Sequence, residues 1–552
     1  MRHRSASRLI LPSVLVAASA CVPPGPWRRS PPPPPEPVYA ETGPPPTDNF
    51  TLPPDGRVLT DSNSIAWLLR AAKRYDEART YGRGVRDRGA ARFAELARAI
   101  DLLGADTTEV GRAFGLNRML EEGVRWRAPN LLGEAPESWE VPEAWRRTRY
   151  PVRAVRAATA IELWSLLRQE FAHRTYADED LDAALARVLP ATIAAPDSIS
   201  YATALHDLLA ATSDSRVTLD DPTMLARVGG GVLPFDARTI AGEMVVTRVH
   251  GSAQTSGLQA GDVIERIDDD PIVRKFDAYE RLVSASNAWR RQHDLVQFFL
   301  RGPSGSSASL LVRRTNARGR AEQLTLTVTR VARESRERAP VPSAVATLSP
   351  GVVLLDAAQL DRTRVDSIRA SAASAYPRAL LIDVRRGINE MAWPLVRWLA
   401  DQPRVPLARG RRAVAPKPDT DERLTYEWVR RDPVDSVGRY GGRVVVLIDE
   451  RVDGSAEEFA LALVGGLGAT PIGSPSAGAV GPLASQMLPG GYVVHYPYAE
   501  IRWPDGRQLQ RVGMQPMLDV RPTIAGVRAG IDEPVQAALK WVEQQLATTR
   551  RR

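Results

Sequence analysis

The sequence predicts a multidomain α/β protein, with an N-terminal helical region, then a β-rich domain, and then an α/β core built on a largely parallel sheet. Its 552 residues exceed what one hydrophobic core organises, so we expect two or three domains. From about residue 340 onward, short β-branched runs alternate with helical patterns, which is typical of a parallel sheet covered by helices. The hydrophobic content of 43% and the charged content of 25% are those of a globular protein.

The charge distribution predicts no nucleic-acid partner. The net charge is +8 and the cations are nearly all arginine, but they are scattered among acids without a basic run or interleaved aromatic residues. We expect a solvated basic surface. A weaker alternative is attraction to an anionic membrane or to acidic substrates.

The N-terminus has the pattern of a targeting segment. Three arginines within the first eight residues precede the apolar stretch Leu9–Ala20, and small residues lead to the single cysteine of the chain, Cys21. This resembles a bacterial lipoprotein signal, which implies that residues 1–20 are removed and that lipidated Cys21 anchors the chain to the membrane. Plain secretion is the alternative. Val22 stands where an aspartate often retains lipoproteins at the inner membrane, so we expect an outer-membrane lipoprotein of the cell envelope, facing the periplasm or the cell surface.

A tether and a helical region follow. Residues 21–57 are rich in proline and poor in apolar residues, which predicts an extended spacer of about 3.1 Å per residue. Residues 58–220 carry apolar residues at helical spacing, for example in Ala160–Leu167 and Tyr201–Leu209.

Residues 221–335 change to short β-type runs separated by turns. The segment Gly251–Ile264 combines small residues with the pattern G-L-x-x-G-D-x-I, and further strands are predicted at Leu310–Arg313 and Leu324–Val328. This arrangement resembles a PDZ domain, a fold in which backbone N–H groups bind the C-terminal carboxylate of a peptide.

The PDZ resemblance implies a peptide-binding loop at Gly231, Val232 and Leu233. Pro234 departs from a pairing strand because proline has no N–H donor. Two alternatives therefore remain for this domain, peptide binding and a purely structural lid.

Residues 340–546 alternate between strand and helix patterns, as a helix-covered parallel sheet requires. The predicted strands are Val352–Leu355, Ala379–Asp383 and Val444–Asp449, and the predicted helices are Val365–Ser374, Trp393–Leu399 and Ser455–Leu467.

Ser455 lies where the third of these strands passes through a tight connection into a helix, and it supports two interpretations. Several hydrolase folds hold a nucleophilic serine at such a turn, because the hydroxyl is exposed and free N–H groups of the first helical turn can stabilise an oxyanion. Alternatively, Ser455 and Glu458 form a capping box, which needs no catalysis. The residues around Ser455 favour capping when they are considered alone.

Further motifs occur in order along the chain: Asp214-Ser-Arg216 at the end of the helical region, the PDZ-like block, Asp383-Val-Arg385, Gly473–Gly478, Gly513–Pro516 and Gly530-Ile-Asp532. Together with Ser455, this order is similar to the tail-specific (C-terminal-processing) serine peptidase family, closest to its tricorn-like and retinoid-binding-protein-like branch. The resemblance extends over Ala157–Leu546.

The resemblance implies a serine peptidase core in which Ser455 is the nucleophile of acyl transfer. The oxyanion hole would use the backbone N–H of Ala456 and a second N–H near Gly387. The partners implied are peptides or protein C-terminal tails. No pair of histidines, cluster of cysteines or spacing of acidic residues predicts a metal-binding site, and no cofactor is expected.

The sequence departs from the family at the general base. Ala479 and Val480 stand where processing peptidases carry a lysine, and neither can accept a proton. Arg216 stands where the tricorn-like branch carries a histidine, and an arginine stays protonated.

Two other positions also differ from the family. Gln510 and Arg511 stand near Gly513, where the family is expected to carry a glutamate in the third catalytic role, beside the nucleophile and the base. Gly387–Glu390 replaces the usual paired glycines of the oxyanion loop. His495, on a strand of the peptidase-like domain, is either an ordinary strand residue or a substitute base.

Two functions follow, and whether the chain is an enzyme stays open between them. The first is an envelope-anchored serine peptidase that acts through Ser455. The second is a degenerate relative that binds peptide tails without hydrolysis.

Overall fold

The computed structural model describes residues 68–69, 71–73, 75–76, 96–97, 141, 143–223, 229–280, 283–316, 318–333, 343–372, 377–400, 405–416, 423–431 and 440–550. The predicted signal segment, Cys21 and the proline-rich tether lie outside the described residues. Within the described ranges, none of the helices combines the length and the hydropathy needed to span a bilayer.

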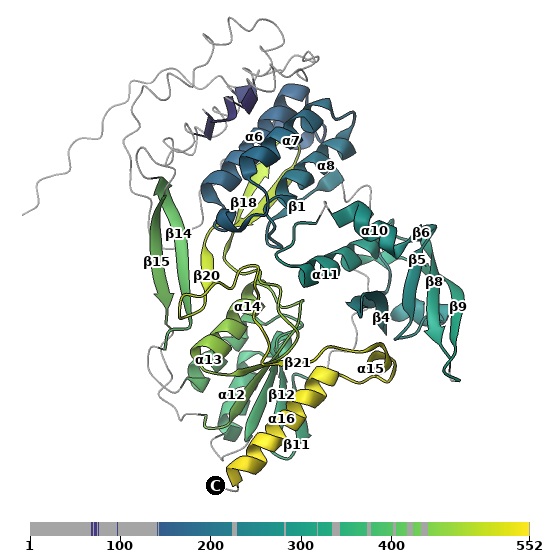
Figure 1. Cartoon of the computed structure of the whole chain (residues 1–552), viewed down its shortest axis with the longest axis vertical. Coiled ribbons are helices and arrows are strands. Elements are labelled where there is room, and N and C mark those ends of the chain that lie inside the picture. The colour runs from purple at the N-terminus through teal and green to yellow at the C-terminus, as the bar shows by residue number, and fades with distance from the viewer. Residues whose placement is uncertain are drawn as a thin grey trace, which may run out of the picture. The chain divides into compact units, whose positions relative to one another are not determined.

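The first described part is a helical layer backed by a small sheet. Its helices are α5 (Glu143–Arg147), α6 (Arg153–Glu170), η1 (Arg174–Tyr176), α7 (Leu181–Ala194) and α8 (Ser198–Ala210). The sheet has the order β1-β19-β18 and consists of β1 (Thr218–Asp220), β19 (Tyr492–Pro497) and β18 (Leu483–Leu488). Figure 1 shows α6, α7 and α8 packed against this sheet.

Residues far apart in the sequence complete the core of this layer. The buried Trp164 and Tyr201 share one hydrophobic cluster with Tyr492 and Tyr496 of β19. The rings of Tyr201 and Tyr492 pack edge to face, with their centroids 5.6 Å apart. The helical region therefore depends on strands from the C-terminal part of the chain for its core.

The second part is a mostly antiparallel β-domain. Its main sheet runs β3 (Phe235–Ile240), β4 (Glu243–Val249), β5 (Val263–Ile267), β8 (Ser307–Thr315) and β9 (Ala321–Thr329), with β6 (Asp270–Pro271) beside β5. A small sheet joins β2 (Gly231–Val232) to β7 (Arg301–Gly302) and β10 (Val331–Ala332), and the helical elements are η2 (Gly251–Ser256), α10 (Ile272–Tyr279) and α11 (Ala288–Phe299).

The Gly-Asp turn of the PDZ-like pattern has a defined structural role. Gly261 adopts a φ of +88°, which favours glycine. The buried Asp262 accepts the N–H of Gln259 at 2.9 Å and pairs with Arg314 at 2.6 Å, so it fixes the turn to the neighbouring strand.

The third part contains the predicted parallel sheet. The strand order is β11-β12-β13-β16-β17-β21, in which β11 (Val345–Ser349) is antiparallel and the others run parallel. The parallel strands are β12 (Val352–Asp356), β13 (Ala379–Asp383), β16 (Arg443–Ile448), β17 (Thr470–Gly473) and β21 (Leu518–Asp519). The predicted multidomain α/β fold class is confirmed.

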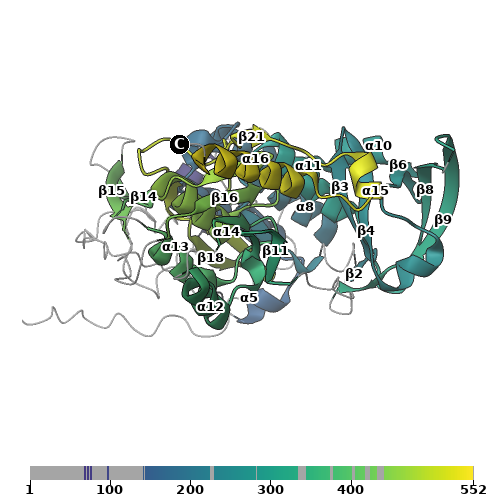
Figure 2. The ribbon, with the colours of Figure 1, turned by 90° about the horizontal axis from the view of Figure 1, so that it is seen from below.

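Helices cover both faces of this sheet because alternate residues of its strands point to opposite sides. Leu380 and Val446 join the core under α12 (Arg362–Ala372), α13 (Pro394–Leu399) and α14 (Gly454–Leu461), whereas Leu381 and Val445 join the core under α16 (Glu533–Arg550). Figures 1 and 2 show α16 lying along its face of the sheet.

Three further elements complete this part. A hairpin of β14 (Ala408–Pro416) and β15 (Arg423–Arg430) pairs with β20 (Glu500–Arg502), and the short helix α15 (Ile524–Arg528) precedes α16. The sequence predicted one helix over Ser455–Leu467, but α14 ends at Leu461 and a π-helical turn, Ala462–Gly466, follows.

Candidate active site

Ser455 lies in the first turn of α14, directly after the connection that leaves the carboxyl end of β16, and its side chain is exposed. The helix begins at Gly454 with Asp453 as its N-cap residue, so the capping-box interpretation of Ser455 is wrong. Glu458, the second residue of that predicted box, instead pairs with Arg430 at 2.6 Å. Ser455 is thus free of a capping role.

The guanidinium of Arg216 lies against the residue that precedes Ser455. Gly454 adopts a φ of +51°, and a Cβ added there would lie 2.4 Å from Nη1 of Arg216. Nε of Arg216 is buried and has no hydrogen-bond partner among the described residues. Arg216, which the resemblance places at the histidine position of the tricorn-like branch, therefore lies at the start of the serine-bearing helix.

A buried aspartate holds Arg216 in this place. Oδ1 of Asp214 accepts the backbone N–H of Arg216 at 2.8 Å, and Oδ2 of Asp214 lies 2.7 Å from Nδ1 of His173. Asp214 and His173 are both about 1% exposed. His173 was not predicted from the sequence, because nothing within its own segment indicates that it lies beside Asp214.

Glu457 anchors the glycine-rich segment that follows β17. Its fully buried carboxylate accepts the N–H of Gly478 at 2.9 Å, the N–H of Ala479 at 2.7 Å and the hydroxyl of Ser476. Burial raises the pKa of Glu457 to about 7, although these hydrogen bonds act in the opposite direction. Glu457 was not predicted from the sequence; the available signal was a second glutamate beside Glu458 in an otherwise apolar helix.

Glu457 is expected to make stability depend on pH. A carboxyl whose pKa rises from 4.5 in the unfolded chain to about 7 in the fold stabilises the protein fully below about pH 4.5, and this contribution is lost as the pH rises through about 7. The loss amounts to about 3 kcal/mol of unfolding free energy. Urea denaturation measures the free energy of unfolding at pH 5 and at pH 8. Between these two values, the free energy of unfolding should fall further in the wild type than in Glu457→Gln. Equal pH dependence in the two proteins would contradict the assignment.

Two motifs from distant parts of the sequence meet at the carboxyl end of β13. Arg385 is 7% exposed and forms paired hydrogen bonds with Asp383 at 2.9 and 2.7 Å and with Asp532 at 3.0 and 2.8 Å. This contact attaches the loop after β13 to the segment before α16.

The two predicted oxyanion donors both have backbone acceptors in this structure. The N–H of Gly387 donates to the carbonyl oxygen of Val384 at 3.0 Å, and the N–H of Ala456 donates to that of Asp453 at 3.1 Å. Gly387 adopts a φ of +91°, which closes its turn. The oxyanion hole stays a prediction.

Residues 363–520 match the family described as Peptidase family S41. This chain carries an S41 peptidase domain. The match contains β13, the loop with Gly387, Ser455 and the glycine-rich segment.

Solved structures of CPAF share the fold of this chain. The structure of mature CPAF complexed with lactacystin has a TM-score of 0.54 at 14% identity, and the alignment covers 72% of this chain and 98% of that chain. The crystal structure of mature CPAF has a TM-score of 0.52 at 14% identity, with coverage of 68% and 94%. The photosystem II D1 C-terminal processing protease has a TM-score of 0.40 at 17% identity, with coverage of 66% and 92%. Among curated proteins, no match is found.

His495, which the sequence left open between an ordinary strand residue and a substitute base, has partners other than Ser455. In β19, its Nδ1 lies 2.7 Å from Oγ of Ser485 and its Nε2 lies 3.1 Å from Oδ2 of Asp220. The structure therefore assigns both ring nitrogens to a Ser-His-Asp chain on the β1-β19-β18 sheet, and none of these hydrogen bonds involves Ser455.

The predicted peptide-binding residues Gly231, Val232 and Leu233 are buried. Gly231 and Val232 form β2, and the N–H of Leu233 donates to the carbonyl oxygen of Leu300 at 2.9 Å. This N–H is already used within the fold, and the role of the three residues in binding a carboxylate stays a prediction.

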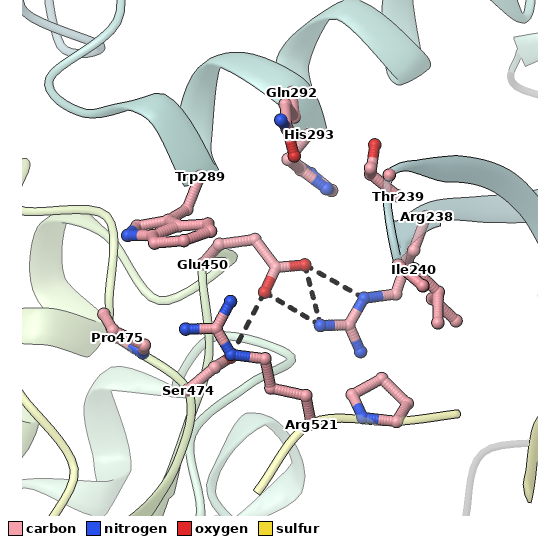
Figure 3. Close-up of a pocket in the computed structure, with 13 residues that line it drawn as sticks. Arg238, Thr239, Ile240, Trp289, Gln292, His293, Glu450, Ser474, Pro475 and Arg521 are labelled. Atoms are coloured by element: carbon pink, nitrogen blue, oxygen red, sulfur yellow. Dashed lines mark hydrogen bonds and ion pairs between the residues drawn. The ribbon is translucent and has the colours of Figure 1, made fainter. Parts of the chain in front are cut away.

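A pocket opens beside the S41 sheet, at the carboxyl ends of β16 and β17 (Figure 3). It encloses about 740 Å³ of space, part of it open to solvent. Glu450 and Ser474 line it from the S41 domain, and Arg238, Thr239 and His293 line it from the β-domain. In open α/β sheets, ligands bind at this edge.

Proposed function

We propose that this chain is a tail-specific serine peptidase that cleaves peptide bonds through Ser455. The observation that carries the proposal is the exposed Ser455 in the first turn of α14, at the carboxyl end of a central strand of an S41 sheet. In the proposed reaction, Oγ of Ser455 attacks the scissile carbonyl carbon and the amine leaves with a proton. Water then hydrolyses the acyl-enzyme and releases the new carboxylate.

The proposed substrates are peptides or protein C-terminal tails. The β-domain supports this because β3 is an edge strand, paired with β4 on one side only within the described sheet. An extended peptide can add to such an edge and gain main-chain hydrogen bonds. The helix α11 packs beside β3 and would form the second wall of that groove.

The proposed location is the cell envelope. It rests on the N-terminal pattern that leads to Cys21, which resembles a lipoprotein signal. The proline-rich segment 21–57 would separate the peptidase from the lipid anchor.

A second candidate function is a peptide-binding module without hydrolysis. The guanidinium of Arg216 beside Gly454 favours it, because a group that stays protonated cannot take the proton of Ser455. Ala479 favours it as well, since it offers the buried Glu457 a backbone N–H where processing peptidases carry a lysine.

Labelling with a fluorophosphonate probe between pH 6 and pH 10 tests the two candidates on the purified mature protein. The peptidase proposal expects labelling that disappears in Ser455→Ala and persists in Ser485→Ala. Ser485 is the matched control, because its Oγ already contacts an imidazole nitrogen. If the folded protein takes no label in this pH range, the peptidase proposal is contradicted and the binding module remains. Labelling that disappears in Ser485→Ala also contradicts the peptidase proposal.

A further inference from the structure

The pocket in Figure 3 is assembled from five segments of the chain. The end of β3 and its turn supply Arg238 to Gly242, and the first turns of α11 supply Trp289, Gln292 and His293. Residues that follow β16, β17 and β21 complete the wall. The pocket therefore lies beside the edge strand that the proposed function assigns to a bound peptide.

The charged groups of the pocket already have partners of opposite charge. Arg238 binds both carboxylate oxygens of Glu450 at 2.7 and 2.8 Å, and it lies 3.2 Å from Asp449. Arg521 stacks on the ring of Trp289 at 4.3 Å and pairs with Asp519 at 3.1 Å. A charged ligand group would have to compete with these pairs, so the pocket does not select for charge of either sign.

Two residues that line this pocket each carry a buried polar atom without a partner in the described part of the chain. Nδ1 of His293 and Oγ1 of Thr239 are buried and make no hydrogen bond to any described residue. Unmatched buried polar atoms are rare in folded proteins, and each costs about 1–3 kcal/mol unless a ligand or water satisfies it. These atoms point to a ligand that hydrogen-bonds.

His293 is neutral at physiological pH. Burial first, and then the nearby cations of Arg290 and Arg451, lower its pKa to about 3. A neutral imidazole has one N–H donor and one acceptor nitrogen, and a threonine hydroxyl can donate and accept. The pocket thus offers both a donor and an acceptor without net charge.

We infer that this pocket is a specificity site for an uncharged carboxamide side chain, asparagine or glutamine, in the bound peptide. The amide oxygen and the NH₂ group of a carboxamide match one acceptor and one donor, and its methylene stem can lie against Trp289 and Pro475. A carboxylate in this place would face Glu450, and an ammonium would face Arg238 and Arg521. The inference rests on the proposed peptide-binding function and specifies its substrate class.

Peptide binding to the full Ser455→Ala chain tests the inference without turnover. Ten-residue peptides with free C-termini, each carrying glutamine, glutamate, lysine or leucine at one position in turn, are compared by fluorescence anisotropy. We expect one position at which glutamine binds about 10–100-fold tighter than glutamate, lysine or leucine, as hydrogen-bonding sites discriminate.

Two variants connect that preference to the pocket. Thr239→Val and His293→Phe should each reduce the glutamine preference to less than about 3-fold. Thr325→Val, the same change at an exposed position of β9, is the control and should retain the full preference.

The possible outcomes separate this inference from the proposed function. Peptides that bind with a preference for glutamate, lysine or leucine, or with a glutamine preference that survives both variants, overturn the specificity site and leave peptide binding intact. Failure of every peptide to bind the folded protein overturns peptide binding itself, and the specificity site with it.

Discussion

Replacing Arg216 with histidine is expected to raise the rate at which a fluorophosphonate labels Ser455 by about 10²–10⁴-fold, the range that a positioned general base contributes. The guanidinium of Arg216 lies beside Gly454, one residue before Ser455, and Asp214 holds the backbone that presents it. A neutral imidazole from this position can accept the serine proton, whereas a guanidinium cannot. The rate should rise through about pH 6.5, the ordinary pKa of histidine.

Two controls separate a new base from the removal of a charge. Arg216→Gln removes the guanidinium without supplying a base, and it should change the labelling rate by less than about 3-fold if base catalysis is responsible for the gain. Arg216→His combined with Ser455→Ala should take no label. An increase in Arg216→Gln equal to that in Arg216→His would show that the arginine merely obstructs the serine.

Arg385→Ala is expected to lower the free energy of unfolding by about 3–5 kcal/mol, because it removes the shared partner of two carboxylates from a largely buried ion-pair cluster. Arg385 binds Asp383 at the end of β13 and Asp532 before α16, each through two hydrogen bonds. Its loss leaves the carboxylate of Asp383, which is only 13% exposed, without this cation. Urea denaturation followed by tryptophan fluorescence measures the change.

Arg507→Ala is the matched control for this prediction. Arg507 also pairs with an aspartate two residues away, Asp505, at 2.7 Å, but its side chain is 70% exposed. Solvent screens such a pair, so its removal should change stability by less than about 1 kcal/mol. Similar losses in the two variants would mean that the Arg385 cluster adds no more than a surface ion pair.

The sequence by itself determined the parallel sheet and the place of Ser455. The strands Val352–Asp356, Ala379–Asp383 and Arg443–Ile448 are short apolar runs whose residues are buried on both faces, and such runs are visible without knowledge of their neighbours. The Gly-Asp turn at Gly261 was likewise predictable, because its conformation depends on local residue types.

Only the tertiary structure decided the surroundings of Ser455. The pattern Ser455-x-x-Glu458 fits a capping box, but in the fold Asp453 takes the N-cap position with its carboxylate 2.9 Å from Arg290 of α11, and Glu458 pairs with Arg430. Side chains from distant segments thus outweighed a local preference of about 1 kcal/mol.

The same reason explains the residues that the sequence did not predict. His173 meets Asp214 across 41 residues, and Glu457 meets the N–H groups of Gly478 and Ala479 in a segment beyond the next strand. Periodicity records which face of an element is buried and does not record which distant group lies opposite. The sequence therefore determined the sheet and its serine, whereas long-range packing placed Arg216 beside Gly454 and fixed the glycine-rich segment on a buried carboxylate.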